Sequence, residues 1–311
     1  MIAVSDLVQA RRIAPVLLTS PHNGLAPVRL LWDRYARQRK LSVGTAPHRP
    51  RPESWGNAGL HAAWLGHSTV LIKIDGVTIV TDPVFSTRIG INIGPLTIGL
   101  KRLVEPALRA KQMPRPDLIL LSHAHMDHFD LPSLRALESK ATRVVTAAKT
   151  ADLLRVKGYG RVEELGWGET ARIGDVSVRA FEVNHWGARM RSDTHRGFNG
   201  YLIETPRYRV VFGGDTAMTT SFRALRSARR LDLAIMPIGA YNPWIRAHCT
   251  PEQALKMADE AGAETILPVH HQTFQLSSEP AYEPIERLSS ALASRPERLA
   301  LREIGQEIHP G

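Results

Sequence analysis

Three histidines and two aspartates lie within nine positions of the sequence, in the stretch SHAHMDHFD at residues 122–130. This stretch directly follows the apolar run DLILL at residues 117–121, which predicts a buried strand. If the strand ends where the polar stretch begins, His123 and His125 point the same way, because side chains alternate along an extended chain. Two imidazoles on one side of a strand end can bind one metal ion together.

The same stretch offers ligands to a second ion. Asp127 and His128 follow where the chain turns, and imidazole and carboxylate are ligands that zinc prefers. Each zinc needs about three to four protein ligands, so further ligands must come from elsewhere. Three other residues of the right type follow apolar, strand-like runs, where functional groups are commonly held: His185, Asp215 and His270. The sequence therefore predicts a dinuclear metal site.

The predicted site suits hydrolysis. Two cations about 3.5–4 Å apart hold a bridging water and lower its pKa towards neutrality. We expect the resulting hydroxide to attack phosphorus or a carbonyl carbon, with Asp127 orienting it or carrying its proton. His248, just before a predicted helix, is the candidate to protonate a leaving alkoxide or to contact a phosphate. His67, Tyr241 and Asn242 are further candidates, either as pocket or ligand-orienting residues or as packing residues.

The elements that position these residues follow from apolar periodicity. Residues 70–74 and 77–81 flank Asp75 and Gly76, which is typical of a two-residue hairpin. Residues 130–139 indicate a helix capped by Asp130. Further strands are predicted at 143–146, 176–183, 200–205, 208–214, 233–238 and 265–269, and helices at 147–157, 221–230, 251–261 and 282–293. Hairpin-linked strands with interspersed helices predict an α+β fold of layered sheets, not a doubly wound parallel sheet.

Composition limits the class of protein. The 311 residues include one cysteine, Cys249, which excludes an internal disulfide and favours a reducing compartment. No uncharged apolar run reaches the ~18 residues that span a bilayer, and the N-terminus lacks a secretory signal pattern. These features predict a cytoplasmic protein, with the inner face of the membrane as a site of peripheral contact.

Charge is concentrated at the N-terminus. The net charge is +10, and residues 1–60 hold nine Lys and Arg against three acidic residues. We interpret residues 1–59 as a basic arm or linker that packs on the domain, and residues 60–311 as the hydrolase domain. Such an arm favours anionic partners, including an anionic membrane, or is only a solubilising extension.

The stretch IGINIGPLTIGLKRL at residues 89–103 carries no charge before Lys101 and Arg102. One interpretation is an exposed loop that dips into a lipid surface, with the basic pair at the level of the headgroups. The alternative is a buried crossover connection.

HAHMDH at residues 123–128 matches the HxHxDH signature of the metallo-β-lactamase-fold hydrolases, and the later ligands follow in that family's order. The resemblance covers roughly residues 60–295 and implies an αββα sandwich with the site at one edge of the paired sheets. It implies two Zn²⁺ ions, with other divalent metals as alternatives. The implied ligands are His123, His125 and His185 for one ion, Asp127, His128 and His270 for the other, and Asp215 as the bridge.

Within that superfamily the closer resemblance is to N-acyl-phosphatidylethanolamine phospholipase D and its bacterial relatives. It is carried by WLGHSTVLI (64–72), TDPVFSTR (81–88), LSHAHMDHFD (121–130), GDT (214–216), LAIMPIGAYNPWIRAHCTPEQA (233–254) and PVHHQTF (268–274). It implies a phosphodiesterase of the phospholipase D type that acts on N-acyl-phosphatidylethanolamine-like lipids.

Alternative functions use the same chemistry. A lactonase or phosphate-ester hydrolase with a small soluble substrate is the main alternative, because the same hydroxide attacks either bond. An RNA-processing phosphodiesterase shares the ligand set, but the domain has no extended basic insertion to hold RNA, so nucleic acid is not expected as a partner. The sequence leaves open whether the chain forms a homodimer.

Overall fold

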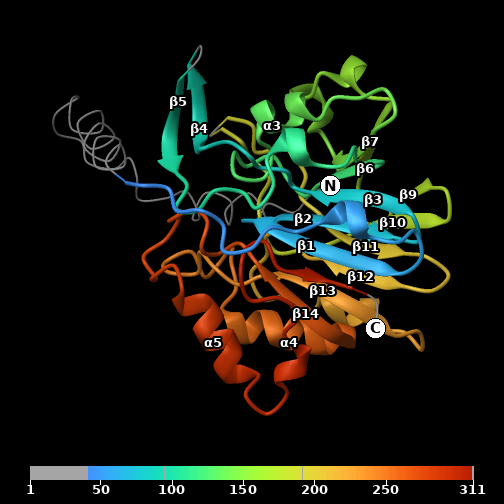
Figure 1. The fold of residues 1–311 in the computed structure, drawn as a ribbon, viewed down its shortest axis with the longest axis vertical. Coiled ribbons are helices and arrows are strands. Elements are labelled where there is room, and N and C mark those ends of the chain that lie inside the picture. Colours follow the sequence, from blue (N-terminus) through green and yellow to red (C-terminus); the bar gives the residue numbers. More distant parts are fainter. Residues whose placement is uncertain (1–40, 94–95, 191, 310–311) are drawn as a thin grey trace, which may run out of the picture. The chain divides into compact units, whose positions relative to one another are not determined.

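Two mixed β-sheets form the centre of the computed structural model, which describes residues 41–93, 96–190 and 192–309 (Figure 1). The elements below all lie in the unit Ser42–Gly311. The first sheet has the order β15-β1-β2-β3-β6-β7-β8, with β1 Leu60–Gly66, β2 Thr69–Ile74, β3 Val77–Thr81, β6 Leu118–Leu121, β7 Arg143–Ala147, β8 Arg161–Leu165 and β15 Glu307–Ile308. The second has the order β14-β13-β12-β11-β10-β9, with β9 Thr170–Ile173, β10 Val176–Phe181, β11 Gly200–Glu204, β12 Arg209–Phe212, β13 Leu231–Pro237 and β14 Ala263–Val269.

The alternation of side chains between the two faces of each strand produces the layers of the fold. In β6, Leu120 packs in the core between the two sheets, whereas Ile119 packs on the outer side with Phe129. In β11, Ile203 faces the shared core and its neighbour Leu202 packs on the opposite side, beneath the helices. Both faces of these strands are therefore buried, as period-two alternation requires in a four-layer sandwich. The predicted αββα sandwich is confirmed.

The described helices cover the outer faces. They are α3 (Leu131–Ala136), α4 (Pro251–Ala261) and α5 (Glu283–Ala291), and Figure 1 shows α4 and α5 beside β13 and β14. Helix α4 begins as predicted, because Thr250 accepts a hydrogen bond from the Gln253 amide and Gln253 accepts one from the Thr250 amide. It ends at Gly262, whose φ of 80° suits glycine. No helix within the described ranges is long and apolar enough to cross a membrane.

Two predicted helices are wrong. Residues 147–157 contain only the short 3₁₀ turns η3 (Ala151–Leu153) and η4 (Val156–Gly158). Lys149 has a φ of 59°, and the Thr150 hydroxyl donates to the Ala147 carbonyl at 2.6 Å, so local side-chain bonding replaces the helical ladder. Residues 221–230 form the single turn η5 (Ser221–Leu225), after which the chain extends towards β13. Strands β1, β8, β9 and β15 carried no prediction; β8 and β9 are partly exposed and lack a clear apolar run.

The stretch at residues 89–103 is neither a loop nor a buried crossover. Strands β4 (Arg88–Ile93) and β5 (Leu96–Lys101) form a separate antiparallel hairpin, apart from both sheets (Figure 1). Gly90 lies opposite Gly99, and a Cβ atom on either would clash with the backbone of the other strand. The glycines therefore permit a close approach of the two strands, which apolar periodicity does not reveal.

The described part of the predicted arm contacts the domain. The Gly44 amide donates to the Leu103 carbonyl at 2.8 Å, His48 pairs with Glu303 at 2.8 Å, and the Trp55 indole donates to Glu307 at 3.0 Å. Residues 1–40 lie outside the described residues, so the predicted basic arm and its membrane contact stay predictions.

Candidate metal centre

The structure brings together all seven residues predicted to bind metal, at the ends of different strands. The stretch after β6 supplies four of them, and one each follows β10, β12 and β14. The chain order of the seven is His123, His125, Asp127, His128, His185, Asp215 and His270. Strand ends are held by the sheets' hydrogen bonds, so these side chains stand on a rigid frame although they lie far apart in the sequence.

One cluster consists of His123, His125, His185 and Asp215, whose nearest ligand atoms lie within 4.8 Å of one another. His125 Nδ1 lies 2.8 Å from His123 Nε2 and 3.3 Å from His185 Nε2. The His185 Nδ1 donates to the Ala247 carbonyl at 2.8 Å, which leaves Nε2 to face the cluster.

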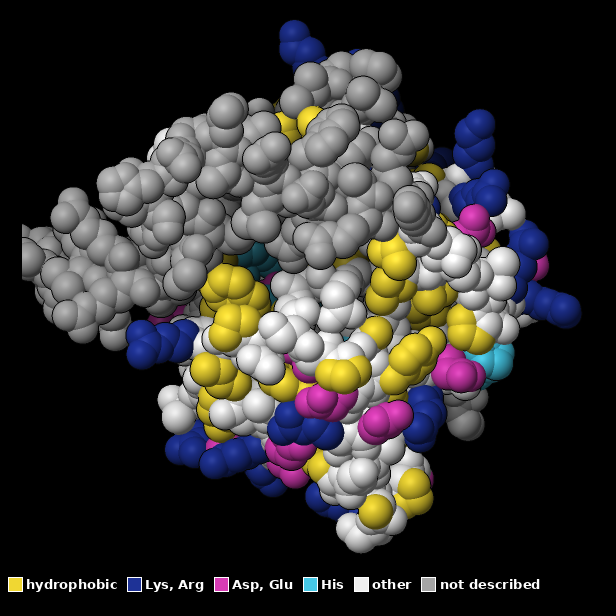
Figure 2. Space-filling view, turned by 90° about the vertical axis from the view of Figure 1, so that its left-hand side faces the viewer, with side chains coloured by type: hydrophobic (Ala, Val, Ile, Leu, Met, Phe, Trp, Pro, Cys, Tyr) yellow, Lys and Arg dark blue, Asp and Glu magenta, His cyan; other side chains and the backbone are white. Residues whose placement is uncertain are grey.

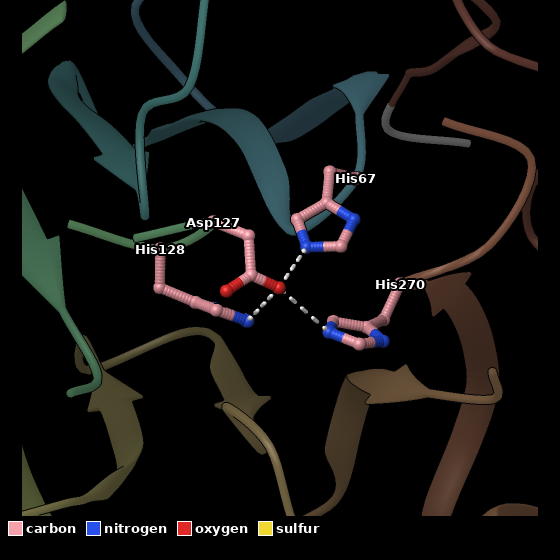
Figure 3. Close-up of side chains that lie close together, drawn as sticks. All are labelled: His67, Asp127, His128 and His270. Carbon is pink, nitrogen blue, oxygen red and sulfur yellow. Dashed lines mark hydrogen bonds and ion pairs between the residues drawn. The ribbon is translucent and has the colours of Figure 1, made fainter. Parts of the chain in front are cut away.

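A second cluster consists of His67, Asp127, His128 and His270 (Figure 3). Asp127 Oδ2 lies 3.0 Å from His67 Nε2, and 3.5 Å from the Nε2 atoms of both His128 and His270. His67 has a φ of 51°, in the left-handed region, and it joins β1 to β2. Its ring points at Asp127 in Figure 3, so the structure favours the ligand-orienting interpretation over simple core packing.

Asp215, a member of the first cluster, also contacts the second. Its Oδ2 is 3.1 Å from the Nε2 atoms of both His128 and His270, and 3.8 Å from His185 Nε2. His248 Nδ1 also lies 3.8 Å from the same oxygen. One carboxylate therefore reaches both groups of histidines, which is the position that a bridging ligand requires.

Asp82, at the end of β3, orients the ligands through a buried hydrogen-bond network that the sequence analysis missed. Asp82 Oδ2 accepts from His128 Nδ1 at 2.7 Å and from the Ser122 hydroxyl at 2.5 Å. The same hydroxyl accepts from His123 Nδ1 at 2.9 Å. Both rings therefore carry a proton on Nδ1, which leaves Nε2 as the atom that faces the clusters. The only sequence signal is the stretch TDPVFSTR, which contains Asp82.

Arg189 is a second missed residue. Its guanidinium donates to the carbonyls of Ala124 and Phe129, at 3.1 Å and 2.8 Å. These two carbonyls lie on either side of the turn that carries His125 and His128, so Arg189 fixes the shape of this turn. A single arginine in the stretch NHWGARMR gives no spacing signal from which this role could be read.

The electrostatics and the donor set fit a divalent cation. Burial lowers the pKa of His125 to about 3 and that of His185 to about 4, so both rings are neutral at pH 7. Burial alone would raise the pKa of Asp215, but His128 and His270 hold it well below the usual range. Asp215 Oδ1 is buried and has no hydrogen-bond partner among the described residues, and the buried Nε2 atoms of His128 and His270 face Asp215 Oδ2 as ion pairs. Burial lowers the pKa of His128 and of His270, but Asp215 outweighs it, raising the pKa of His270 to about 9 and that of His128 well above its ordinary value. These two rings carry protons that a bound divalent cation would displace, so metal affinity depends on pH.

Two predicted residues, Tyr241 and Asn242, make their hydrogen bonds to the segment around the start of α5. Tyr241 is buried, its hydroxyl donates to Glu283 at 2.6 Å, and the Arg287 guanidinium lies 5.0 Å from its ring centre. The backbone amides of Tyr241 and Asn242 both donate to Glu279, each at 3.1 Å. These contacts tie the loop after β13 to the segment that leads into α5, so the structure favours packing roles.

Comparison with known proteins identifies the family. A family model described as beta-lactamase superfamily domain matches residues 77–271. An uncharacterised protein of Mycobacterium tuberculosis is 31% identical over 298 residues, covering 90% of this chain and 77% of the relative. An N-acyl-phosphatidylethanolamine-hydrolyzing phospholipase D of Caenorhabditis elegans is 28% identical over 256 residues, covering 76% of this chain and 71% of that enzyme. The structure of a metallo hydrolase from Ignicoccus hospitalis has a similar fold, with a TM-score of 0.59 and 19% identity over 80% of this chain and 97% of that one. The chain belongs to the beta-lactamase superfamily and is a metal-dependent hydrolase of that fold.

Proposed function

We propose that the protein is a dinuclear-zinc phosphodiesterase of the phospholipase D type that acts on N-acyl-phosphatidylethanolamine-like lipids. The similarity to the Caenorhabditis elegans enzyme, whose name states this substrate, supports the proposal. When bound, the two ions would supply Lewis acidity to the phosphoryl group. The residues that would hold them are His123, His125 and His185 for one ion and Asp127, His128 and His270 for the other, with Asp215 in contact with both.

The observation that carries the proposal is the position of His248. Its Nδ1 lies 3.8 Å from Asp215 Oδ2, is buried, and has no hydrogen-bond partner among the described residues. Burial lowers the pKa of His248 well below its ordinary value, so the ring is neutral and serves as a hydrogen-bond donor. A donor aimed at the centre suits the developing charge on a phosphoryl oxygen or a departing alkoxide.

The surroundings hold His248 in this place. Its own amide donates to the Trp244 carbonyl at 3.0 Å, and helix α4 starts two residues later with the Thr250 cap. The preceding carbonyl, that of Ala247, accepts from His185. The loop that carries His248 is therefore fixed to one of the ligands, so the donor is positioned before a substrate arrives.

Two features of the protein surface suit contact with an amphiphilic, anionic substrate. Ile91 and Ile98 lie opposite one another on the β4–β5 hairpin and are 49% and 43% exposed. Figure 2 shows basic side chains mostly around the margin of the described part of one face, with hydrophobic and some acidic side chains nearer its middle. Exposed apolar side chains with basic neighbours are typical of proteins that contact anionic lipid. We therefore include in the proposal a peripheral contact with an anionic membrane.

The test uses vesicles that contain N-acyl-phosphatidylethanolamine. Zinc-loaded protein is expected to release N-acylethanolamine, detected by mass spectrometry, and a chelator is expected to stop the release. The Asp215→Asn variant serves as the inactive control. If protein with two bound metals releases no N-acylethanolamine, the lipid proposal is wrong. Small lactones and phosphate esters would then be assayed in its place.

A further inference from the structure

Arg102 is a buried arginine whose guanidinium has no hydrogen-bond partner among the described residues. It directly follows β5, it is 1% exposed, and it is among the largest fully buried side chains. Its Nε, Nη1 and Nη2 atoms are each buried without a hydrogen-bond partner in the part of the chain that the structure describes. Arginine is among the residues that are rarely buried unless they are paired, so this unpaired cation requires a physical explanation.

The surroundings of Arg102 place it beside the metal centre. The guanidinium carbon lies 5.3 Å from the ring centre of Phe274, and that ring lies 5.2 Å from the ring centre of His67. A Cβ added to Gly66 would lie 3.6 Å from Arg102 Nη2, so the guanidinium also lies near the residue before His67. His67 contacts Asp127. One aromatic side chain, that of Phe274, therefore stands between Arg102 and the His67 ring of the second cluster.

The backbone holds Arg102 firmly. Its amide donates to the Thr87 carbonyl at 2.9 Å, and the amide of Leu103 donates to the Thr273 carbonyl at 2.7 Å. The Thr273 hydroxyl in turn accepts from the His67 amide at 2.6 Å. These bonds join the base of the hairpin to the loop that carries His270, so the side chain of Arg102 is presented from a fixed backbone.

No described carboxylate forms an ion pair with Arg102. Burial lowers its pKa to about 10, although Asp130 and Glu105 act in the opposite direction from a distance. Asp130 is itself bonded to the hydroxyls of Ser86 and Ser133. Arg102 is therefore charged at pH 7, and a buried charge without a hydrogen-bonded counterion is strongly unfavourable.

We propose that Arg102 is the centre of an anion-binding subsite that holds a phosphoryl or carboxylate group of the substrate next to the metal centre. The planar guanidinium presents parallel N–H donors that match such an anion. An apolar cluster of Val84, Ile89 and Phe274 lies at the base of the hairpin, so the subsite offers one cation beside apolar surface. That combination suits an anionic amphiphile. The subsite rests on the proposed function only for the identity of the molecule that brings the anion.

The first test measures anion binding without turnover. Metal-loaded wild type, Arg102→Met and a control, Arg155→Met, are compared by thermal unfolding over a sulfate series at constant ionic strength. Arg155 is an exposed arginine, 68% accessible, that pairs with Glu138, so the control makes the same chemical change at the surface. We expect sulfate to raise the midpoint of wild type and of the control, and the rise to be lost in Arg102→Met.

If Arg102 has only a structural role, the thermal unfolding experiments give a different result. Removal of an uncompensated buried charge is expected to leave the sulfate-free midpoint unchanged or to raise it, because apolar replacement of buried charges is often stabilising. A lowered midpoint in Arg102→Met, with a sulfate response equal to that of wild type, overturns the proposal. If this variant does not fold, Arg102→Lys takes its place. Lysine keeps the positive charge but lacks the parallel N–H donors of a guanidinium, so sulfate should bind to Arg102→Lys about tenfold more weakly than to wild type. An unchanged sulfate affinity overturns the proposal.

The second test uses a soluble substrate, bis(4-nitrophenyl) phosphate. If Arg102 holds the substrate's anion, Arg102→Met should raise KM about tenfold to a hundredfold with a smaller change in kcat. An unchanged KM, together with an unchanged sulfate response, refutes the subsite. If wild type does not hydrolyse this diester, the proposed reaction fails, whereas the sulfate series still decides the subsite.

Discussion

Replacement of Asp82 by asparagine tests whether the buried network sets the metal affinity. The change keeps the size of the side chain but converts one acceptor oxygen into a donor NH₂ group. Three donors converge on Asp82: the Ser122 amide, the Ser122 hydroxyl and His128 Nδ1, at 2.7, 2.5 and 2.7 Å. One amide oxygen cannot accept from all three, so at least one donor must face another donor.

The expected loss of metal affinity follows from the tautomer of His128, that is, from which ring nitrogen carries the proton. If its ring moves the proton to Nε2 to avoid the amide, the atom that faces Asp215 loses its lone pair and cannot bind a cation. Loss of a hydrogen-bond partner behind a metal ligand typically lowers metal affinity tenfold to a hundredfold, which is about 1.4 to 2.8 kcal/mol. We expect this loss at the site that uses His128, with a smaller effect transmitted to His123 through Ser122.

The assay combines metal content after dialysis with competitive titration against a chromophoric chelator. Asp117→Asn is the matched control, because Asp117 accepts from the Thr78 amide at 2.9 Å, at the opposite end of the β3–β6 pair. The control should keep both metals at wild-type affinity. Wild-type affinity in Asp82→Asn as well would refute the reasoning, since the network would then have no influence on the ligands.

Four further outcomes are expected. Asp215→Asn should abolish activity and lower the bound metal measured by mass spectrometry while the circular dichroism spectrum is kept; full activity with two metals would exclude the bridging position. His248→Ala should retain both metals but lower kcat by about 10²–10³-fold, and a change in KM alone would remove its role as a donor. Deletion of residues 1–40 should weaken binding to anionic vesicles more than turnover of a soluble ester, and unchanged vesicle binding would leave the arm a solubilising extension. The Arg196 hydrogen bond lowers the pKa of Asp152, so this interaction stabilises the fold above about pH 4 and is lost as the pH falls further; the midpoint difference between wild type and Asp152→Asn should shrink at low pH.

The sequence alone determined which seven candidate ligands meet at the metal centre, because these histidines and aspartates follow strand-like runs and strand ends gather at the edges of sheets. It also determined the β2–β3 hairpin, whose turn residues Asp75 and Gly76 both have positive φ, and the start of α4 at the Thr250 cap. These features are local: a turn, a cap and a strand end depend on a few neighbouring residues.

The tertiary structure alone decided which partners stand behind the ligands. Asp82 reaches Ser122 and His128 only because β3 and β6 are parallel neighbours, with Thr81 opposite Leu120. The unpaired burial of Arg102 likewise depends on the hairpin folding back towards Phe274. Such contacts join residues dozens of positions apart, and no periodicity along the chain encodes a pairing that is set by the register and packing of sheets.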